Sequence, residues 1–462
     1  LGKFSLSPYV PQAPAQAVGE HNGKGFESKR LPVRPEPVEG RAGTSIPKHP
    51  LSGLTVMEFA TFIASPWVTG LLSDLGARVI KIEPITGDLY RAMAFPKMCK
   101  TIQGKEALSL DLKDPRAQEA VQKLIAKSDV LLHNFRPGVP ERLGIGWETA
   151  RKIRPDIVYV YAGAYGSTGP HSHRTGFHPI AGAITGAPWQ QAKTVIPPSD
   201  QPLTLDELQY YGHITRKSNE TNPDPCAAMA CASATMLAIY YRALTGKGQY
   251  VETSMLGGNL YANADDALSY AGKPERPSVD KDFNGLNALY RQYQTKQWWV
   301  FFACPSQSEW EAFGKATGRT DLLNDARFNT VEARRANDAA LAAALEPLFA
   351  TRTAREWEAL LAKADVACVE VLDGDNGKFL VTQPWTKDAG IYTPTEHPSL
   401  GKYWRANAPW AFSLTPGQAG PNCYLGEHTR PILRELGYDN ATVDQWVAEG
   451  IAVSHEAQPV AG

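Results

Sequence analysis

Residues 54–84 read LTVMEFATFIASPWVTGLLSDLGARVIKIEP, and this stretch decides the fold. LTVMEFA is a short apolar run typical of a buried strand, and RVIKIEP is a second one. Between them, Pro66–Leu75 predicts a helix, because proline is favoured at the first helical position and Gly76 ends the run. A strand, a helix and a second strand in this order predict a βαβ unit with two parallel strands.

The same alternation continues along the chain. PRAQEAVQKLIAKS (115–128) predicts a helix, with Asp114 as its N-cap and Pro115 at its first position. Further strands are predicted at residues 107–112, 129–135 and 157–163. The fold class is therefore α/β with a largely parallel sheet. Ligands bind such sheets at the carboxyl ends of the strands, which here carry FIASP, HNFRPG and GAYGSTGP.

The pattern of apolar and polar residues divides the remaining chain into further segments. Small and large apolar residues alternate from Pro225 to Gly246, which is typical of a buried helix, and residues 286–303 predict a hairpin. We expect a Pro/Gly-rich linker or arm at 1–50, a large domain at 51–240, a linker at 241–284, a small α+β domain at 285–370 and a return to the large domain at 371–462. The arm is either a processed start or a link to another domain of a longer tandem protein.

Composition excludes several classes of protein. The 462 residues carry 47 basic and 48 acidic side chains, so nucleic acid is not an expected partner. The six cysteines form no CxxC pair and no zinc spacing. Neither a secretory signal nor an uninterrupted apolar run long enough to span a bilayer is visible, so we expect no membrane association and a cytoplasmic location. Neither GxGxxG after the first strand nor a P-loop occurs.

Six blocks of the sequence carry a family resemblance. The stretch from residue 51 to 84 resembles the start of the family III CoA-transferases (the CaiB/BaiF type). Later blocks are similar to that family in the same order as far as residue 450: KTIQGKEALSLDLKDP, HNFRPGVPERLGIGWE, YVYAGAYGSTGP, ALTGKGQYVETSML and GEHTRPILRELGY. The resemblance implies a Rossmann-like large domain built from both chain ends, a smaller α+β domain and an interlocked homodimer. It also implies coenzyme A, bound as an acyl-CoA substrate.

The resemblance implies a set of CoA contacts as well. An arginine fork suits phosphate, and an aromatic ring can cover the adenine face. The alternatives are a helix cap for Asn134, a surface position for Arg136, a solvated loop for Lys105, loop packing for Phe62 and Ala64, and helix-face pairs with Glu141 or Glu148 for Arg142. The CoA contacts carried over from the family are Phe62, Ala64, Lys105, Asn134, Phe135, Arg136 and Arg142.

The chain departs from the family at the position of its nucleophile. The family places an aspartate there, and the aligned run GPHSHRTGFHPIAGAITG puts His178 in its place. The family's carboxylate attacks the thioester and becomes one half of a mixed anhydride, a role that imidazole cannot take. His178 could instead form an acyl-imidazole, act as a general base or only pack beneath the ligand.

A nearby acid could restore the anhydride route. Asp200, Asp206 and Asp224 lie in the stretch that follows His178. The polar segment 187–224 looks longer than the family usually has there, which favours a lid or a dimer contact. His171 and His173 could in principle bind a metal, but no third ligand is evident, so we expect no metal.

Three functions remain at this stage. The leading one is a CoA-transferase that moves CoA between an acyl-CoA and a small carboxylic acid, with His178 as the catalytic candidate. The second is an acyl-CoA racemase or isomerase that works by α-proton transfer. The third is a non-catalytic CoA-binding half of a tandem or heteromeric transferase. The acyl group is not predictable, because pocket side chains converge from distant segments.

Overall fold

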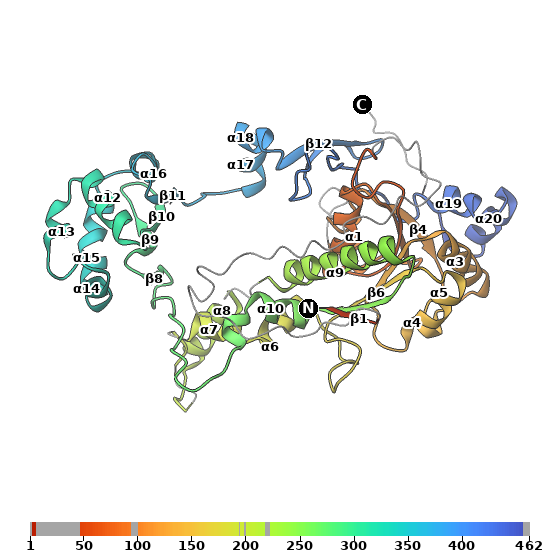
Figure 1. Ribbon diagram of the computed structural model, residues 1–462, viewed down its shortest axis with the longest axis horizontal. Coiled ribbons are helices and arrows are strands. Elements are labelled where there is room, and N and C mark those ends of the chain that lie inside the picture. Colours follow the sequence, from red (N-terminus) through yellow and green to blue (C-terminus); the bar gives the residue numbers. More distant parts are fainter. Residues whose placement is uncertain are drawn as a thin grey trace, which may run out of the picture. The chain divides into compact units, whose positions relative to one another are not determined.

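The computed structural model describes residues 2–5, 47–93, 100–193, 195–197, 200–217 and 222–455 (Figure 1). Most of the predicted arm at 1–50 therefore lies outside the described residues. The chain forms two compact units. The larger combines residues 1–185, 221–264 and 383–462, and the smaller combines residues 186–220 and 265–382.

The larger unit is built on an eight-stranded sheet in the order β1-β7-β6-β5-β2-β3-β4-β14. The six inner strands are parallel, and β1 and β14 add to the two edges in antiparallel fashion. The strands are β1 (Gly2–Phe4), β2 (Thr55–Phe59), β3 (Arg78–Glu83), β4 (Glu106–Leu110), β5 (Val130–His133), β6 (Val158–Gly163), β7 (Tyr250–Ser254) and β14 (Ala452–Val453). This sheet confirms the prediction of a parallel-dominated α/β fold.

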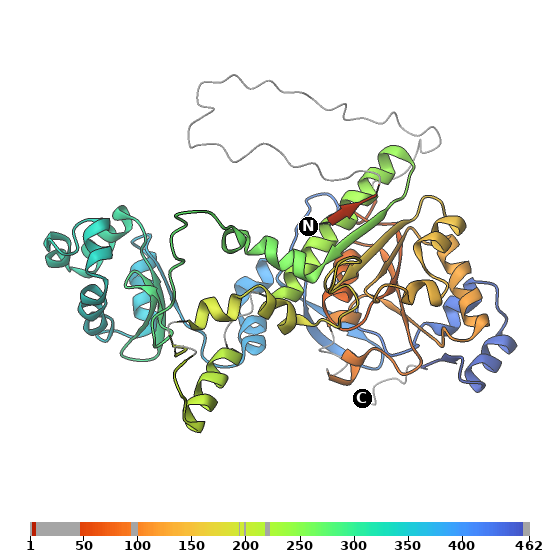
Figure 2. The same ribbon diagram turned by 90° about the horizontal axis from the view of Figure 1, so that it is seen from below.

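Helices cover both faces of the sheet, because successive residues of each buried strand point to opposite sides. Met57 belongs to one apolar cluster, with α3, α5, α19 and α20, and Val56 belongs to the other, with α1 and α9 (Figures 1 and 2). These helices are α1 (Ala64–Asp74), α3 (Pro115–Lys127), α5 (Trp147–Ile153), α9 (Pro223–Thr245), α19 (Thr429–Glu435) and α20 (Asn440–Ala448). The larger unit therefore has three layers, with the sheet in the middle and an apolar core between the sheet and the helices on each side.

Shorter elements complete the larger unit. They are α2 (Leu89–Met93), η2 (Lys100–Ile102), α4 (Val139–Arg142), α6 (His178–Ile184), α10 (Met255–Ala262), α18 (Pro384–Asp388) and the antiparallel pair β12 (Tyr392–His397) and β13 (Gly401–Ala406). A salt bridge between Arg405 of β13 and Asp74 of α1, at 2.6 Å, joins the end of the chain to its beginning.

Helix α9 is, within the described residues, the one helix long and apolar enough to cross a membrane. The sequence had suggested that no such segment exists. Its Ala228, Cys231 and Ala238 are buried in the same apolar cluster as Val158 and Val251 of the sheet. One face of α9 therefore packs against the sheet as a core helix does, and the other face stays exposed.

The smaller unit has its own core. A four-stranded antiparallel sheet in the order β11-β10-β9-β8 packs on helices through rings such as Phe302, Phe349 and Trp357. The predicted hairpin is confirmed as β9 and β10. The strands are β8 (Gly285–Asn287), β9 (Tyr290–Gln294), β10 (Trp299–Ala303) and β11 (Ala367–Glu370), and the helices are α12 (Gln307–Thr317), α13 (Thr320–Asn324), α14 (Val331–Ala336), α15 (Asp338–Phe349) and α16 (Ala354–Ala362).

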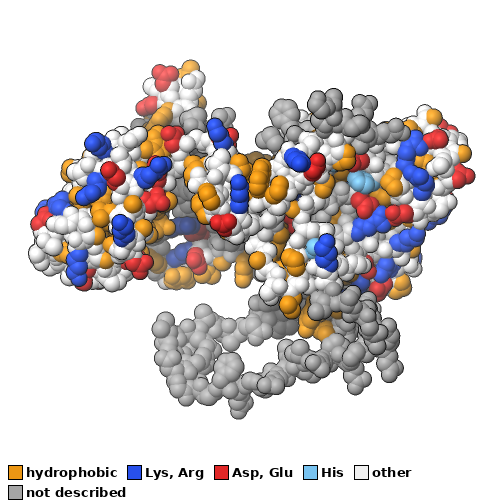
Figure 3. Space-filling view, turned by 90° about the horizontal axis from the view of Figure 1, so that it is seen from above, with side chains coloured by type: hydrophobic (Ala, Val, Ile, Leu, Met, Phe, Trp, Pro, Cys, Tyr) orange, Lys and Arg blue, Asp and Glu red, His pale blue; other side chains and the backbone are white. Residues whose placement is uncertain are grey.

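Of the four remaining helices in the described residues, α7 (Ala187–Ala192), α8 (Leu205–Lys217) and α17 (Asn376–Thr382) belong to the smaller unit, and α11 (Ala264–Ala267) crosses its boundary with the larger one. On the face drawn in Figure 3, the described basic and acidic side chains are interspersed rather than gathered into a field of one sign. That distribution agrees with the near-zero net charge of the chain.

The structure differs from the sequence expectation in its domain limits. We expected a linker at 241–284, but β7 and α10 lie there and belong to the larger unit. The expected boundary followed the end of the long helix at Gly246, although YVETS just after it keeps the buried pattern of a strand. The smaller unit also takes in residues 186–220 and 371–382, which we had assigned to the large domain.

Candidate active site

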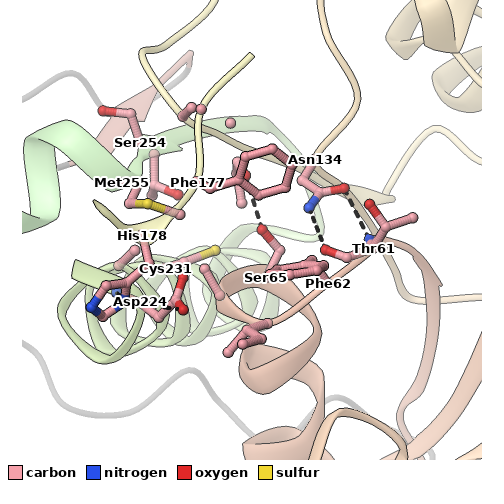
Figure 4. Close-up of a pocket in the computed structure, with 18 of the residues that line it drawn as sticks. Thr61, Phe62, Ser65, Asn134, Phe177, His178, Asp224, Cys231, Ser254 and Met255 are labelled. Carbon is pink, nitrogen blue, oxygen red and sulfur yellow. Dashed lines mark hydrogen bonds and ion pairs between the residues drawn. The ribbon is translucent and has the colours of Figure 1, made fainter. Parts of the chain in front are cut away.

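A cavity of about 290 Å³ opens in the larger unit where the parallel strands end (Figure 4). Its wall comes from the residues after β2, β5, β6 and β7. The direction in which successive strands are added to the sheet reverses between β2 and β5. Strands β3 and β4 follow on one side of β2, whereas β6 and β7 follow on the far side of β5. Ligands of open α/β sheets bind at such a switch point.

The loop after β2 forms one wall and is held in an unusual conformation. Phe62 has a φ of 71°, a left-handed value that is costly for a residue with a bulky side chain. Its amide donates to the Asp88 carboxylate at 3.0 and 3.2 Å, and its ring packs edge-on against Phe177. Ala64 follows at the start of α1 and also lines the cavity.

A buried charge network supports that loop from below. The ammonium of Lys81 lies 2.9 Å from Asp88 and 2.8 Å from Glu58, and Lys105 lies 2.6 Å from Glu58. Burial works against the charge of Asp88, but Lys81 and the amides of Phe62 and Tyr90 outweigh it, so the pKa of Asp88 is lowered. The network thus fixes an ionised carboxylate behind the Phe62 amide.

Lys105 belongs to this network and not to the cavity wall. Its side chain is 0% exposed, and its ammonium also donates to the carbonyl of Pro66 at 2.6 Å. Burial lowers the pKa of Lys105, while Glu58 opposes that shift. The sequence had suggested a phosphate contact or a solvated loop position. In this structure Lys105 is a core residue that braces β2 and α1.

The loop after β5 is joined to the loop after β2 by Asn134. Its side-chain oxygen accepts from the Thr61 amide at 3.1 Å, and its side-chain nitrogen donates to the Thr61 carbonyl at 2.9 Å (Figure 4). Arg136 lines the cavity as well, and its guanidinium donates to the carbonyl of His173 at 3.4 Å. Asn134 and Arg136, two of the predicted CoA contacts, therefore both line this cavity.

Two other predicted contacts lie outside this lining. The ring of Phe135 stacks on His133 at 6.1 Å between centroids and borders a separate small cavity. Arg142 ends the short helix α4 and does not line the main cavity.

His178 and Asp224 meet at the cavity, although 46 positions separate them. His178 begins α6, and Asp224 lies in the first turn of α9. The Nδ1 atom of His178 is 3.1 Å from Oδ2 of Asp224, and the amide of Asp224 lies 3.3 Å from the same nitrogen (Figure 4). The structure thus places an imidazole and a carboxylate side by side.

Burial and nearby charged groups shift the pKa of Asp224, the acid of this pair. Burial raises the pKa of the Asp224 carboxyl, and the imidazole of His178 and the ammonium of Lys100 oppose that rise. Lys100 sits over the Trp67 ring, with its nitrogen 3.9 Å from the ring centroid. A partly desolvated carboxylate beside an imidazole and an ammonium is the kind of group that enzymes use as a nucleophile or base.

The other sequence candidates fall elsewhere. Asp200 and Asp206 are exposed, belong to the smaller unit and do not line the cavity. His171 packs against Tyr165, with ring centroids 5.9 Å apart. Within the described residues, no three His, Cys, Asp or Glu side chains are grouped as metal ligands. The expectation that the enzyme needs no metal stays a prediction.

Two parts of the site were not among the predicted site residues. Thr253 and Ser254 line the cavity at the end of β7, in a segment that we expected to be a linker. Asp88 was missed because it follows a strand by five residues, and no local pattern marks a side chain that turns back to a distant amide. For the first part, the strand pattern of YVETS was the available signal.

The fold and the site together define an α/β enzyme whose cavity lies at the switch point of a parallel sheet and holds a histidine–aspartate pair. The CoA-transferase family III profile matches residues 51–429, and the chain belongs to that family. This finding confirms the resemblance seen in the sequence.

Individual relatives agree with the family. The succinyl-CoA:glutarate CoA-transferase of Mus musculus is 25% identical over 419 residues, which cover 88% of this chain and 92% of the relative. The acetyl-CoA:oxalate CoA-transferase of Acetobacter aceti is 29% identical over 339 residues, covering 71% and 82%. A crystal structure of a CaiB/BaiF family protein from Brucella suis superposes with a TM-score of 0.68 at 26% identity, covering 84% of this chain and all of that one.

Proposed function

We propose that this protein transfers CoA from an acyl-CoA to a small carboxylic acid at the cavity of its larger unit. The observation that carries the proposal is the His178–Asp224 pair, which puts a carboxylate and an imidazole in a cavity at the sheet's switch point. The names of the relatives support dicarboxylic acids as acceptors, since the mouse and Acetobacter enzymes are named for glutarate and oxalate. The guanidinium of Arg136, at the same cavity, suits a carboxylate or a phosphate.

We propose CoA contacts that follow from these positions. Phe62, Ala64, Asn134 and Arg136 would approach the thioester arm directly, because all four line the cavity. Phe135 and Arg142 would serve the nucleotide end of CoA outside it. Lys105 would act indirectly, by bracing the strand and helix that carry the first loop.

A racemase or isomerase is the second candidate. The observation in its favour is the same pair, because one group could accept the α-proton as a base while the other returns a proton to the α-carbon as an acid. The third candidate is a non-catalytic CoA-binding half of a larger transferase. The carboxylate of Asp224 in the cavity argues against it, because such a half would need no nucleophile.

One incubation separates the three candidates. Purified protein would meet succinyl-CoA with glutarate, and acetyl-CoA with oxalate, in D2O, with the products read by mass spectrometry. New pairs of acyl-CoA and free acid are the expected result. Deuterium at the α-carbon without CoA exchange would assign the protein to the racemase class. CoA binding with neither reaction would favour the non-catalytic half.

We also propose a homodimer and a cytoplasmic location. Helix α9 exposes four large apolar side chains at spacings that place them on one face: Met229, Leu237, Tyr240 and Leu244. A stripe of this kind is typical of a surface that another chain covers, and the interlocked arrangement of the family would supply a second copy.

A further inference from the structure

We propose that Asp224 is the covalent nucleophile of this enzyme, in place of the aspartate whose position His178 occupies. The inference rests on the proposed CoA-transferase function and adds the residue that forms the intermediate. It starts from the fact that the anhydride route needs a carboxylate at the thioester, so a chain with histidine at that position needs an acid from elsewhere.

The cavity offers few alternatives to Asp224. Among the described residues that line it, Asp224 is the one carboxylate. Burial raises the pKa of the Cys231 thiol to about 11, so that group stays protonated near neutral pH. The hydroxyl of Ser65 donates to the Ala162 carbonyl at 2.9 Å, and the hydroxyl of Ser254 caps α10 by accepting from Gly257. Asp224 is therefore the available ionised oxygen nucleophile.

Three features of its position offset the burial that raises the pKa of Asp224. Its carboxylate lies in the first turn of the 23-residue helix α9, where the aligned peptide dipoles stabilise negative charge. The imidazole of His178 and the ammonium of Lys100 also oppose the rise. His178 acts here as a positioning residue, because its Nδ1 holds Oδ2 at 3.1 Å and leaves Oδ1 to attack.

The reaction balances without any further reagent. Oδ1 of Asp224 bonds to the thioester carbonyl carbon, the C–S bond breaks, and CoA leaves as its thiolate. The thiolate then attacks the aspartyl carbonyl of the mixed anhydride, which releases the first acid and leaves an aspartyl-CoA thioester. The acceptor carboxylate attacks that thioester and expels the thiolate again. The thiolate finally attacks the new acyl carbonyl, giving the product acyl-CoA and restoring the Asp224 carboxylate.

Trapping of the intermediate tests the assignment in the unmodified protein. The full chain would react with succinyl-CoA in the presence of hydroxylamine, and its peptides would be mapped by mass spectrometry. We expect a hydroxamate on Asp224 that forms only when succinyl-CoA is present. Transfer from succinyl-CoA to glutarate with the adduct on His178 or Cys231, or with no adduct on Asp224, would overturn the inference. Absence of transfer itself would instead overturn the proposed function.

Substitutions give an independent test. Asp224→Asn should lower kcat for succinyl-CoA:glutarate transfer by at least about 10³-fold, the scale of losing a covalent nucleophile. The double variant His178→Asp with Asp224→Asn should regain transfer, with the adduct moved to position 178. Asp206→Asn, at an exposed position on α8, is the matched control and should keep its activity. An Asp224→Asn variant that folds, as judged by its Tm, and keeps full transfer would overturn the inference.

Discussion

At the scale of single residues, one ring nitrogen of His178 contacts two different groups of Asp224. Nδ1 of His178 faces both an acceptor, Oδ2 of Asp224, and a donor, the amide of the same residue. A protonated Nδ1 donates to the carboxylate, and an unprotonated Nδ1 accepts from the amide. The amide lies in the first turn of α9, where it has no partner within the helix. The ring tautomer of His178 therefore decides which group of Asp224 its Nδ1 holds.

The pH dependence of transfer follows from this contact. His178 opposes the burial that raises the pKa of Asp224, so His178→Asn should raise that pKa further. Attack requires the ionised carboxylate, and activity is gained as pH rises through this pKa. We therefore expect the acidic limb of the kcat/KM profile to move to higher pH in His178→Asn. A limb that stays in place or moves to lower pH would contradict this account.

The charge network beneath Phe62 gives a prediction about stability. Asp88→Asn removes one partner of the buried Lys81, and breaking a buried pair costs about 3–5 kcal/mol. The pKa of Asp88 is lowered in the folded chain, so its stabilisation is present above the unfolded pKa and is lost as pH falls through the folded value. Urea unfolding should show a large loss at neutral pH that shrinks in acid.

Asp114→Asn is the matched control for this measurement. Asp114 is half-buried at the surface and caps α3, a position where asparagine serves as well as aspartate, so the free energy of unfolding of this variant should stay close to that of the unchanged chain. An equal loss in both variants would mean that the Asp88 network contributes nothing special.

At the scale of elements, local chemistry was enough for much of the fold. The strands at β2 to β6 were predictable because each is a short apolar run, and α3 because Asp114 caps it and Pro115 begins it. Strand β7 keeps a visible strand pattern as well, but the expected domain boundary separated it from the large domain. The placement of Lys105 was beyond prediction, and Asp224 was only one of three acids offered as a partner for His178, since each contact depends on packing between segments far apart in the sequence.

The contact between α9 and α10 gives a prediction at this scale. A Cβ atom at Gly258 would lie 3.1 Å from Cα of Ala227 and 3.2 Å from its nitrogen, so the backbone of α9 would have to move. Gly258→Val should cost about 1–3 kcal/mol. It should also lower kcat, because Ala227 lies one turn from Asp224. Ala262→Val, at an exposed position on α10, should change neither quantity. Full activity in Gly258→Val would show that the helices tolerate the shift.

At the scale of the whole molecule, the apolar stripe on α9 predicts the assembly state. Sedimentation equilibrium should give twice the chain mass. The double variant Leu237→Glu with Tyr240→Glu should fall to a single chain mass or aggregate, because charge on a covered apolar face is costly. Lys152→Glu, exposed on α5, serves as the control and should stay dimeric. A single chain mass for the unchanged protein would contradict the proposed homodimer.

The last described strand, β14, forms one edge of the sheet in the larger unit. β14 pairs with β4, and Arg405 pairs with Asp74, so segments more than 300 positions apart complete one core. During synthesis, β2 to β7 leave the ribosome long before β14, while the smaller unit is complete well ahead of it. The nascent chain must therefore carry a sheet with a bare β4 edge until β14 is made. Such an edge invites pairing with other strands, which gives chaperones a specific place to act.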